Sequence, residues 1–236
     1  RLDAKGRGTF ARVLQTKRLL DAYQIKYNVL CVLTNPLAKE AQRVFDFLKE
    51  EQIAFVQFIP CLADLDATST NDYALTPRSF AGFYQQLLAF WLQELKQGRY
   101  LSIKLFDDLL NLLVRQQVTA CGILGNCQVQ YVIEADGSVY PCDFYVLDEY
   151  RMGYIQEQTL RQLFSQDCSQ QFLCQKKDMP SKCTQCPFQK MCRGGCKRMK
   201  DAMYVDSEGF CGYQELLKDF TPRINEILGL LQGVRQ

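Results

Sequence analysis

The chain has 236 residues, 47% of them hydrophobic, which is enough to build the core of one large domain or two modest ones. Its formal net charge of only +2 argues against a general nucleic-acid binder, which would be more basic. No apolar stretch approaches the ~20 residues of a membrane span, and no secretory signal pattern opens the chain. We therefore expect neither nucleic acid nor a membrane as a partner.

The first half of the chain alternates helical and strand patterns. Apolar periodicity predicts helices at 9–24, 35–51, 77–97 and 107–115, and strands at 26–34 and 54–60. Both strands are mostly apolar, as buried parallel strands are. This alternation predicts βαβ units and hence a parallel sheet. The polar segment 61–75 follows a strand at its carboxyl end, where α/β proteins bind ligands.

The pattern changes near residue 117, where we predict a domain boundary. Strands at 128–134 and 138–142 flank Asp136-Gly137, a strong signal for a two-residue hairpin turn. A short helix at 159–164, a cysteine-rich segment and an amphipathic helix at 214–231 follow. The sequence thus predicts an α/β part, residues 1–117, and a cysteine-rich part, residues 118–236.

Eight of the twelve cysteines stand at close spacings in the second half of the chain. They are Cys121, Cys127, Cys142, Cys183, Cys186, Cys192, Cys196 and Cys211. Without an export signal, these thiols indicate metal ligands in a reducing compartment, the cytoplasm, rather than disulfides. Histidine is absent, which excludes histidine-containing zinc sites and nucleophiles paired with histidine. Eight thiols suffice for two four-ligand centres, either iron–sulfur clusters or all-cysteine zinc sites.

The complete spacing resembles the SPASM domain, the auxiliary-cluster domain of many radical S-adenosylmethionine (SAM) enzymes. The match runs Cys121-x5-Cys127-x9-Gly137-x4-Cys142, then Cys183-x2-Cys186-x5-Cys192-x3-Cys196-x14-Cys211. Three segments, 57–62, 140–148 and 192–196, further resemble the anaerobic sulfatase-maturating enzymes. The resemblance extends over essentially the whole chain. It implies an α/β fold in which 1–117 is the carboxy-terminal part of a partial (β/α)6 radical SAM barrel and 118–236 is the SPASM domain.

One element of the family pattern is missing. Radical SAM enzymes bind their reactive [4Fe–4S] cluster through CxxxCxxC, whereas the first two cysteines here, Cys31 and Cys61, are 30 residues apart. Together with the start at Arg1, this predicts a carboxy-terminal fragment that does not generate a radical alone. SAM and the third, radical-generating cluster are then expected only in the full-length protein.

The resemblance implies a reaction for that full-length protein, an oxidoreductase. A 5′-deoxyadenosyl radical would abstract a Cβ hydrogen from an active-site cysteine or serine of a sulfatase, and loss of a second electron and a proton would give Cα-formylglycine. The partners implied are an unfolded sulfatase or another peptide, and an electron donor such as a flavodoxin or ferredoxin.

Individual residues carry the implied roles. Asp143, directly after Cys142, matches the catalytic aspartate, and partial dehydration would raise its pKa toward that of a useful base. Its structural alternative is to accept hydrogen bonds from backbone amides. Leu62 is a candidate SAM contact, with ordinary packing as its alternative. Family topology assigns the ligands of two auxiliary [4Fe–4S] clusters: Cys121, Cys127, Cys142 and Cys196 for the first, and Cys183, Cys186, Cys192 and Cys211 for the second.

Several alternatives remain open from the sequence. A second interpretation is a SPASM-type radical SAM enzyme that modifies another peptide, and without CxxxCxxC the chain also fits a non-catalytic iron–sulfur or zinc protein for electron transfer or scaffolding. Four basic residues, Arg193, Lys197, Arg198 and Lys200, offset cluster charge in one interpretation and form a solvated face in the other. Cys31 is expected as a small core residue, and Cys168 and Cys174 are assigned to no site.

Overall fold

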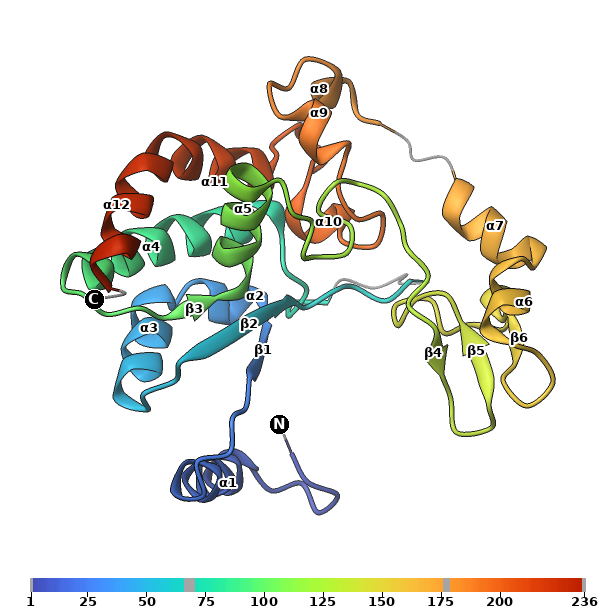
Figure 1. The fold of residues 1–236 in the computed structure, drawn as a ribbon, viewed down its shortest axis with the longest axis horizontal. Coiled ribbons are helices and arrows are strands. Elements are labelled where there is room, and N and C mark those ends of the chain that lie inside the picture. The colour runs from blue at the N-terminus through green and yellow to red at the C-terminus, as the bar shows by residue number, and fades with distance from the viewer. Residues whose placement is uncertain (1, 66–70, 176–178, 235–236) are drawn as a thin grey trace.

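A parallel sheet lies at the centre of the first half of the chain. The computed structural model describes residues 2–65, 71–175 and 179–234 (Figure 1). Strands β1 (Val29–Leu33), β2 (Phe55–Pro60) and β3 (Ser102–Ile103) pair in the order β1-β2-β3 and all run parallel. Helices α2 (Asn35–Ala38), α3 (Ala41–Glu50) and α4 (Pro77–Lys96) connect these strands, and α5 (Lys104–Arg115) follows β3. The predicted parallel sheet is confirmed.

Two expectations for this half need correction. The helix predicted at 35–51 is divided at Lys39 and Glu40, because the turn capped by the Thr34 hydroxyl ends there and α3 starts afresh. The strand β1 is parallel but not buried on both faces: Leu30 is 62% exposed and Val32 53% exposed. Alternate side chains of a strand point to opposite faces, and no element in the described ranges covers the face that carries these two. Helix α1 (Phe10–Ala22) contains no buried residue.

Helix α4 is the centre of the main core. Thr76 caps its first turn, Pro77 occupies its first position, and its buried face includes Phe80, Phe83 and Trp91. The Trp91 indole donates a buried hydrogen bond of 2.8 Å to the Leu101 carbonyl, which holds the approach to β3 against the helix. This core therefore fixes the position of the sheet relative to everything packed on α4.

The C-terminal helices pack on α4 as well. The helix predicted at 214–231 is two helices, α11 (Gly212–Phe220) and α12 (Ile224–Val234), separated by the turn η2 (Thr221–Arg223). Phe220 and Ile227 are fully buried in the core that contains α4. At Gly212 the backbone approaches so closely that an added Cβ would lie 2.2 Å from the Pro77 carbonyl oxygen. The end of the chain thus returns to the α/β half.

The hairpin part has a small core of its own. Strands β4 (Val132–Ile133), β5 (Ser138–Tyr140) and β6 (Gly153–Tyr154) form an antiparallel sheet, which confirms the hairpin predicted around Asp136-Gly137. The short helices η1 (Asp148–Tyr150), α6 (Leu160–Phe164) and α7 (Asp167–Cys174) accompany it. Val139, Met152 and Leu163 are its buried residues. Figure 1 shows this part standing to one side of the sheet and α4.

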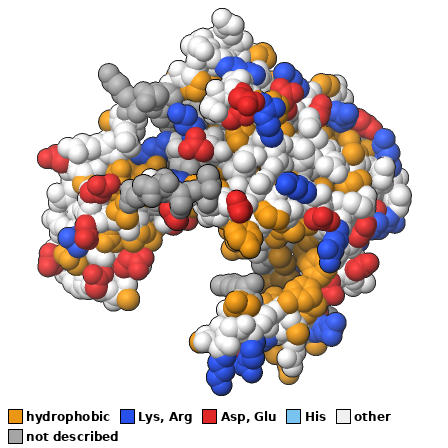
Figure 2. Space-filling model, turned by 180° about the vertical axis from the view of Figure 1, so that it is seen from behind, with side chains coloured by type: hydrophobic (Ala, Val, Ile, Leu, Met, Phe, Trp, Pro, Cys, Tyr) orange, Lys and Arg blue, Asp and Glu red, His pale blue; other side chains and the backbone are white. Residues whose placement is uncertain are grey.

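Three short helices, α8 (Ser181–Thr184), α9 (Gln189–Cys192) and α10 (Lys200–Met203), lie between the two cores. Seen from behind, the molecule curves around an open space, and hydrophobic side chains gather along part of its inner wall (Figure 2). A boundary near residue 117 remains a prediction, and residues 118–234 contribute to both cores. None of the helices in the described ranges is both long and apolar enough to cross a membrane.

Candidate metal centres

The first predicted cysteine group comes together where the hairpin meets the segment after α9. A methyl group added at Gly122 would lie 2.9 Å from the Cys196 Cβ, so the turn that carries Cys121 lies directly against Cys196. After burial, the thiols of Cys196 and Cys127 raise the pKa of Cys121. Burial is also the main cause that raises the pKa of Cys142 to about 12, and Cys196 adds to it. The four cysteines therefore interact electrostatically as one group.

The second group surrounds a small cavity. Cys183, Cys186, Cys192 and Cys211 all line it. Burial raises the pKa of the Cys192 thiol to about 12, and Cys211, Cys183 and Cys186 contribute to that rise. Cys211 itself is buried. Because thiols with raised pKa values stay protonated at neutral pH, a metal that binds here must displace their protons.

Glycines bring the two cysteine segments into contact. Gly125 has φ +74°, and an added Cβ would lie 2.6 Å from the carbonyl oxygens of both Cys192 and Arg193. Gly195 has φ +64° and lies against the ring of Tyr204, where an added Cβ has no room. Only glycine adopts these backbone conformations without strain. The spacing of the two groups is thus set by main-chain contact between residues 121–127 and 192–196.

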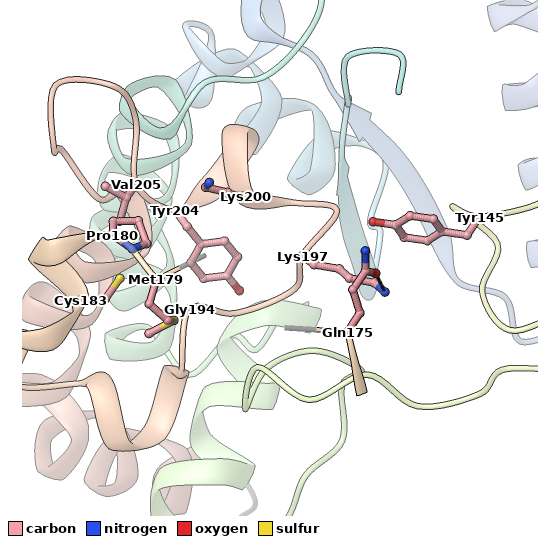
Figure 3. A pocket seen from close by; sticks show the side chains of 10 residues that line it. All are labelled: Tyr145, Gln175, Met179, Pro180, Cys183, Gly194, Lys197, Lys200, Tyr204 and Val205. Atoms are coloured by element: carbon pink, nitrogen blue, oxygen red, sulfur yellow. Dashed lines mark hydrogen bonds between the residues drawn. The ribbon is translucent and has the colours of Figure 1, made fainter. Parts of the chain in front are cut away.

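A pocket of about 230 Å³ opens beside the second group (Figure 3). Cys183, Gly194 and Tyr204 line one side, and Lys197 and Tyr145 lie across from them. Tyr204 is buried, and its phenol interacts electrostatically with both Cys192 and Cys196. The Tyr204 ring therefore lies close to both cysteine groups.

Asp143 lies beside the first group, as its sequence position predicts. Its Oδ1 accepts a hydrogen bond of 3.5 Å from the Cys142 thiol, and its charge raises the pKa of Cys121 and of Cys142. The expected partial dehydration of the Asp143 carboxyl is not observed, because this side chain is exposed among the residues that the structure describes. Asp148, by contrast, lies on η1 with its side chain 87% exposed, as expected of a solvated loop residue.

The other residues singled out from the sequence lie elsewhere. Leu62 follows β2 and is half-buried against the main core. Cys31 lies in β1 opposite Phe58 and packs on the same core. Cys168 and Cys174 lie on α7, and the Cys168 thiol donates to the Glu149 carbonyl at 3.7 Å. These positions place none of the four in a cysteine group.

Two of the four basic residues near the cysteines hold segments together. The Lys197 ammonium lies 3.7 Å from the centre of the Phe172 ring and donates to the Phe172 carbonyl. Arg198 donates to the Ala63 carbonyl, and this bond joins the loop after β2 to the cysteine segment. These contacts show that the two residues are not simply a solvated face, and the charge-offset interpretation stays a prediction.

Sequence reasoning missed two polar residues at the second group. The Gln214 Nε2 donates to the Cys186 thiol at 3.3 Å, and Tyr213 lines the same cavity. Their only sequence signal is their position just after Cys211, whose sulfur caps α11 by accepting from the Gln214 amide at 3.4 Å.

The chain resembles proteins of known family over nearly its whole length. The SPASM model, described as an iron–sulfur cluster-binding domain, matches residues 121–187. The cysteine-type anaerobic sulfatase-maturating enzymes of Clostridium novyi (strain NT) and Clostridium perfringens (strain ATCC 13124) are 36% and 34% identical, over 93% and 95% of this chain. The solved structure of native anSMEcpe with bound AdoMet superposes with a TM-score of 0.86 at 34% identity over 96% of this chain.

The chain is similar to anaerobic sulfatase-maturating enzymes over nearly its whole length. The α/β fold with part of a radical SAM barrel and a SPASM domain is thereby confirmed. A serine-type member of the family, from Bacteroides thetaiotaomicron, is more distant at 25% identity. The chain spans 59% and 62% of the two clostridial relatives and 63% of anSMEcpe.

The cysteine groups fit the cofactor that this family domain binds. Four thiols around one cavity are the ligand set of a [4Fe–4S] cluster, in which each thiolate binds a different iron. Among the described residues, no three cysteine, aspartate or glutamate side chains are placed to hold a single metal ion together. The second group shows this fit most directly, because all four of its cysteines line one cavity.

Proposed function

We propose that the protein containing this chain oxidises an active-site residue of a sulfatase to Cα-formylglycine. In this proposal residues 118–236 hold two auxiliary [4Fe–4S] clusters, and Asp143 is the base. The observation that carries it is the assembly of eight cysteines into two interacting groups, one with Asp143 hydrogen-bonded to a ligand. The relatives are named as sulfatase-maturating enzymes, and a related solved structure contains AdoMet and a peptide.

Each group has a distinct part in the proposed reaction. The two cysteine groups would hold the clusters, which would supply an acceptor for the electron released in the second oxidation step. Asp143 accepts the proton from the thiol or hydroxyl of the substrate residue, which must leave for the aldehyde to form. The exposed position of Asp143 leaves it accessible to a peptide. Leu62, at the carboxyl end of β2, is the proposed SAM contact.

The target residue is proposed to be cysteine. Identity with the cysteine-type relatives is 34–36%, against 25% with the serine-type relative. The peptide partner is an unfolded segment of the sulfatase, and the electron donor is a flavodoxin or ferredoxin. We place the reaction in the cytoplasm, because the close spacing of the eight cysteines indicates thiolate ligands rather than disulfides, and a reducing compartment keeps such thiols reduced.

The test uses the full-length protein, since the 236 residues of this sequence contain no CxxxCxxC segment. Two auxiliary clusters predict about eight iron and eight sulfide beyond those of the radical-generating cluster. Replacing Asp143 with asparagine should leave iron content and SAM cleavage unchanged and slow formylglycine formation about 10²-fold or more, the usual loss on removing a general base. Asp148→Asn is the matched control and should retain full activity. Normal product formation by Asp143→Asn would refute the assigned base, and zinc without sulfide would refute the clusters.

A further inference from the structure

The cavity of the second cysteine group carries hydrogen-bond donors as well as thiols. Gln214 and Tyr213 line it together with the four cysteines. The Gln214 side chain is only 8% exposed, and its Nε2 already donates to the Cys186 sulfur at 3.3 Å. Its backbone amide donates to the Cys211 sulfur at 3.4 Å. Two sulfurs of this group therefore receive hydrogen bonds from one residue.

Tyr213 is buried beside this cavity with its hydroxyl unused. The side chain is 1% exposed, and within the described ranges its phenol oxygen has no hydrogen-bond partner. Leaving a buried hydroxyl unsatisfied costs about 1–3 kcal/mol, so such groups normally have a partner. The nearby Tyr204 differs, because its oxygen accepts from the Cys196 amide. The described residues thus supply no acceptor for the hydroxyl of Tyr213.

We propose that Gln214 and Tyr213 donate hydrogen bonds to the sulfur atoms of a cluster held by Cys183, Cys186, Cys192 and Cys211, and that these bonds raise its reduction potential above that of the other cluster. The proposal rests on the two clusters of the proposed function. Hydrogen bonds to cluster sulfurs stabilise the more negative, reduced state, and solvent exposure and nearby charge act on the same equilibrium.

The first cysteine group has a negative charge beside it. The Asp143 carboxylate lies 3.5 Å from the Cys142 sulfur. A negative charge next to a ligand disfavours the addition of an electron. The hydrogen-bond donors raise the reduction potential of the second cluster, and the carboxylate lowers that of the first. Both effects widen the difference between the two potentials. An electron shared between the clusters therefore resides mainly on the second, away from Asp143.

The experiment is a redox titration of the full-length protein, loaded with iron and sulfide and followed by electron paramagnetic resonance. We expect the auxiliary clusters to be reduced at two separate potentials. Gln214→Met keeps the size of the side chain without its donor and should make the second cluster at least tenfold harder to reduce, which is 59 mV for a one-electron couple. Tyr213→Phe should shift the same potential in the same direction, and the first cluster should not move in either variant.

Controls separate hydrogen bonding from altered packing. Gln185→Met makes the same change at an exposed residue next to Cys186, and Tyr84→Phe removes a buried phenol oxygen from the α4 core. Neither should move the potential. Gln214→Glu should shift it further than Gln214→Met, because a carboxylate adds negative charge. Equal shifts in Gln214→Glu and Gln214→Met would overturn the inference. Unchanged potentials in both Gln214→Met and Tyr213→Phe would overturn it as well. Failure of the unmodified protein to bind iron would instead overturn the proposed function.

Discussion

Replacing Gly125 with alanine should push the two cysteine segments apart. Gly125 has φ +74°, a conformation that costs an alanine about 1–2 kcal/mol. The added Cβ would also lie 2.6 Å from the carbonyl oxygens of Cys192 and Arg193. These are main-chain atoms that cannot rotate away, so the segment must shift, and such overpacking costs about 1–3 kcal/mol. We expect the free energy of unfolding to fall by about 2–5 kcal/mol in total.

Gly98→Ala is the matched control for this prediction. Gly98 has φ +73°, almost the same backbone conformation, but no atom lies within 4 Å of an added Cβ. Its cost should therefore be limited to the backbone strain of about 1–2 kcal/mol. Chemical denaturation of the anaerobically purified protein measures both variants, and iron analysis should show a loss of metal in Gly125→Ala alone. Equal stability and equal iron content in the two variants would refute the contact between the segments.

Three further predictions concern stability and metal content. Trp91→Phe removes the 2.8 Å hydrogen bond to the Leu101 carbonyl and should lower the unfolding free energy by about 1–3 kcal/mol, so an unchanged Tm would contradict it. The Arg99 guanidinium, and to a smaller extent the Lys49 ammonium, hold the pKa of Glu94 below its usual 4.5. The contribution of these ion pairs to the unfolding free energy is therefore fully present above pH 4.5 and is lost as the pH falls through the lowered pKa. Glu94→Gln should flatten this loss in acid denaturation curves, and curves identical to those of the unmodified protein would argue against it. Cys192→Ser should lower the iron content by about one cluster, whereas Cys168→Ser on α7 should not, and equal iron in both would contradict the grouping.

Local sequence patterns predicted turns, because the geometry of a turn depends on residues that are adjacent in the sequence. The turn at Asp136-Gly137 formed as expected, with Gly137 at φ +84°. Pro222 also carried a local signal that the prediction of one helix at 214–231 ignored. Proline lacks the amide that a helix interior requires, and the structure places a short turn there between α11 and α12.

Tertiary packing decided what the sequence could not reveal. Leu30 and Val32 have the composition of a buried strand, yet what covers a strand face depends on other segments. The return of α11 to α4 likewise depends on contacts between residues more than 100 positions apart, such as Gly212 with Pro77.

In the candidate site, too, sequence signals predicted some residues, and only the folded structure revealed others. The spacing identified eight cysteines as metal ligands, whereas their division into two sets came from the resemblance to the SPASM domain and stays a prediction. Spacing alone does not separate Cys192 from Cys196, which are four residues apart and are assigned to different sets. The roles of Gln214 and Tyr213 were not predictable, since Gln214 reaches a sulfur 28 residues earlier in the chain and a single glutamine carries no motif.

Cys211 belongs both to the second cysteine group and to the first turn of α11. A cluster bound at this thiol would thus anchor a helix that closes the main core over α4. Newly made chains that have not received iron would hold this helix end only by packing and by the hydrogen bond to the Cys211 sulfur, and proteases should digest them faster. Digestion rates would then follow iron supply, so that incompletely assembled copies are removed before they accumulate.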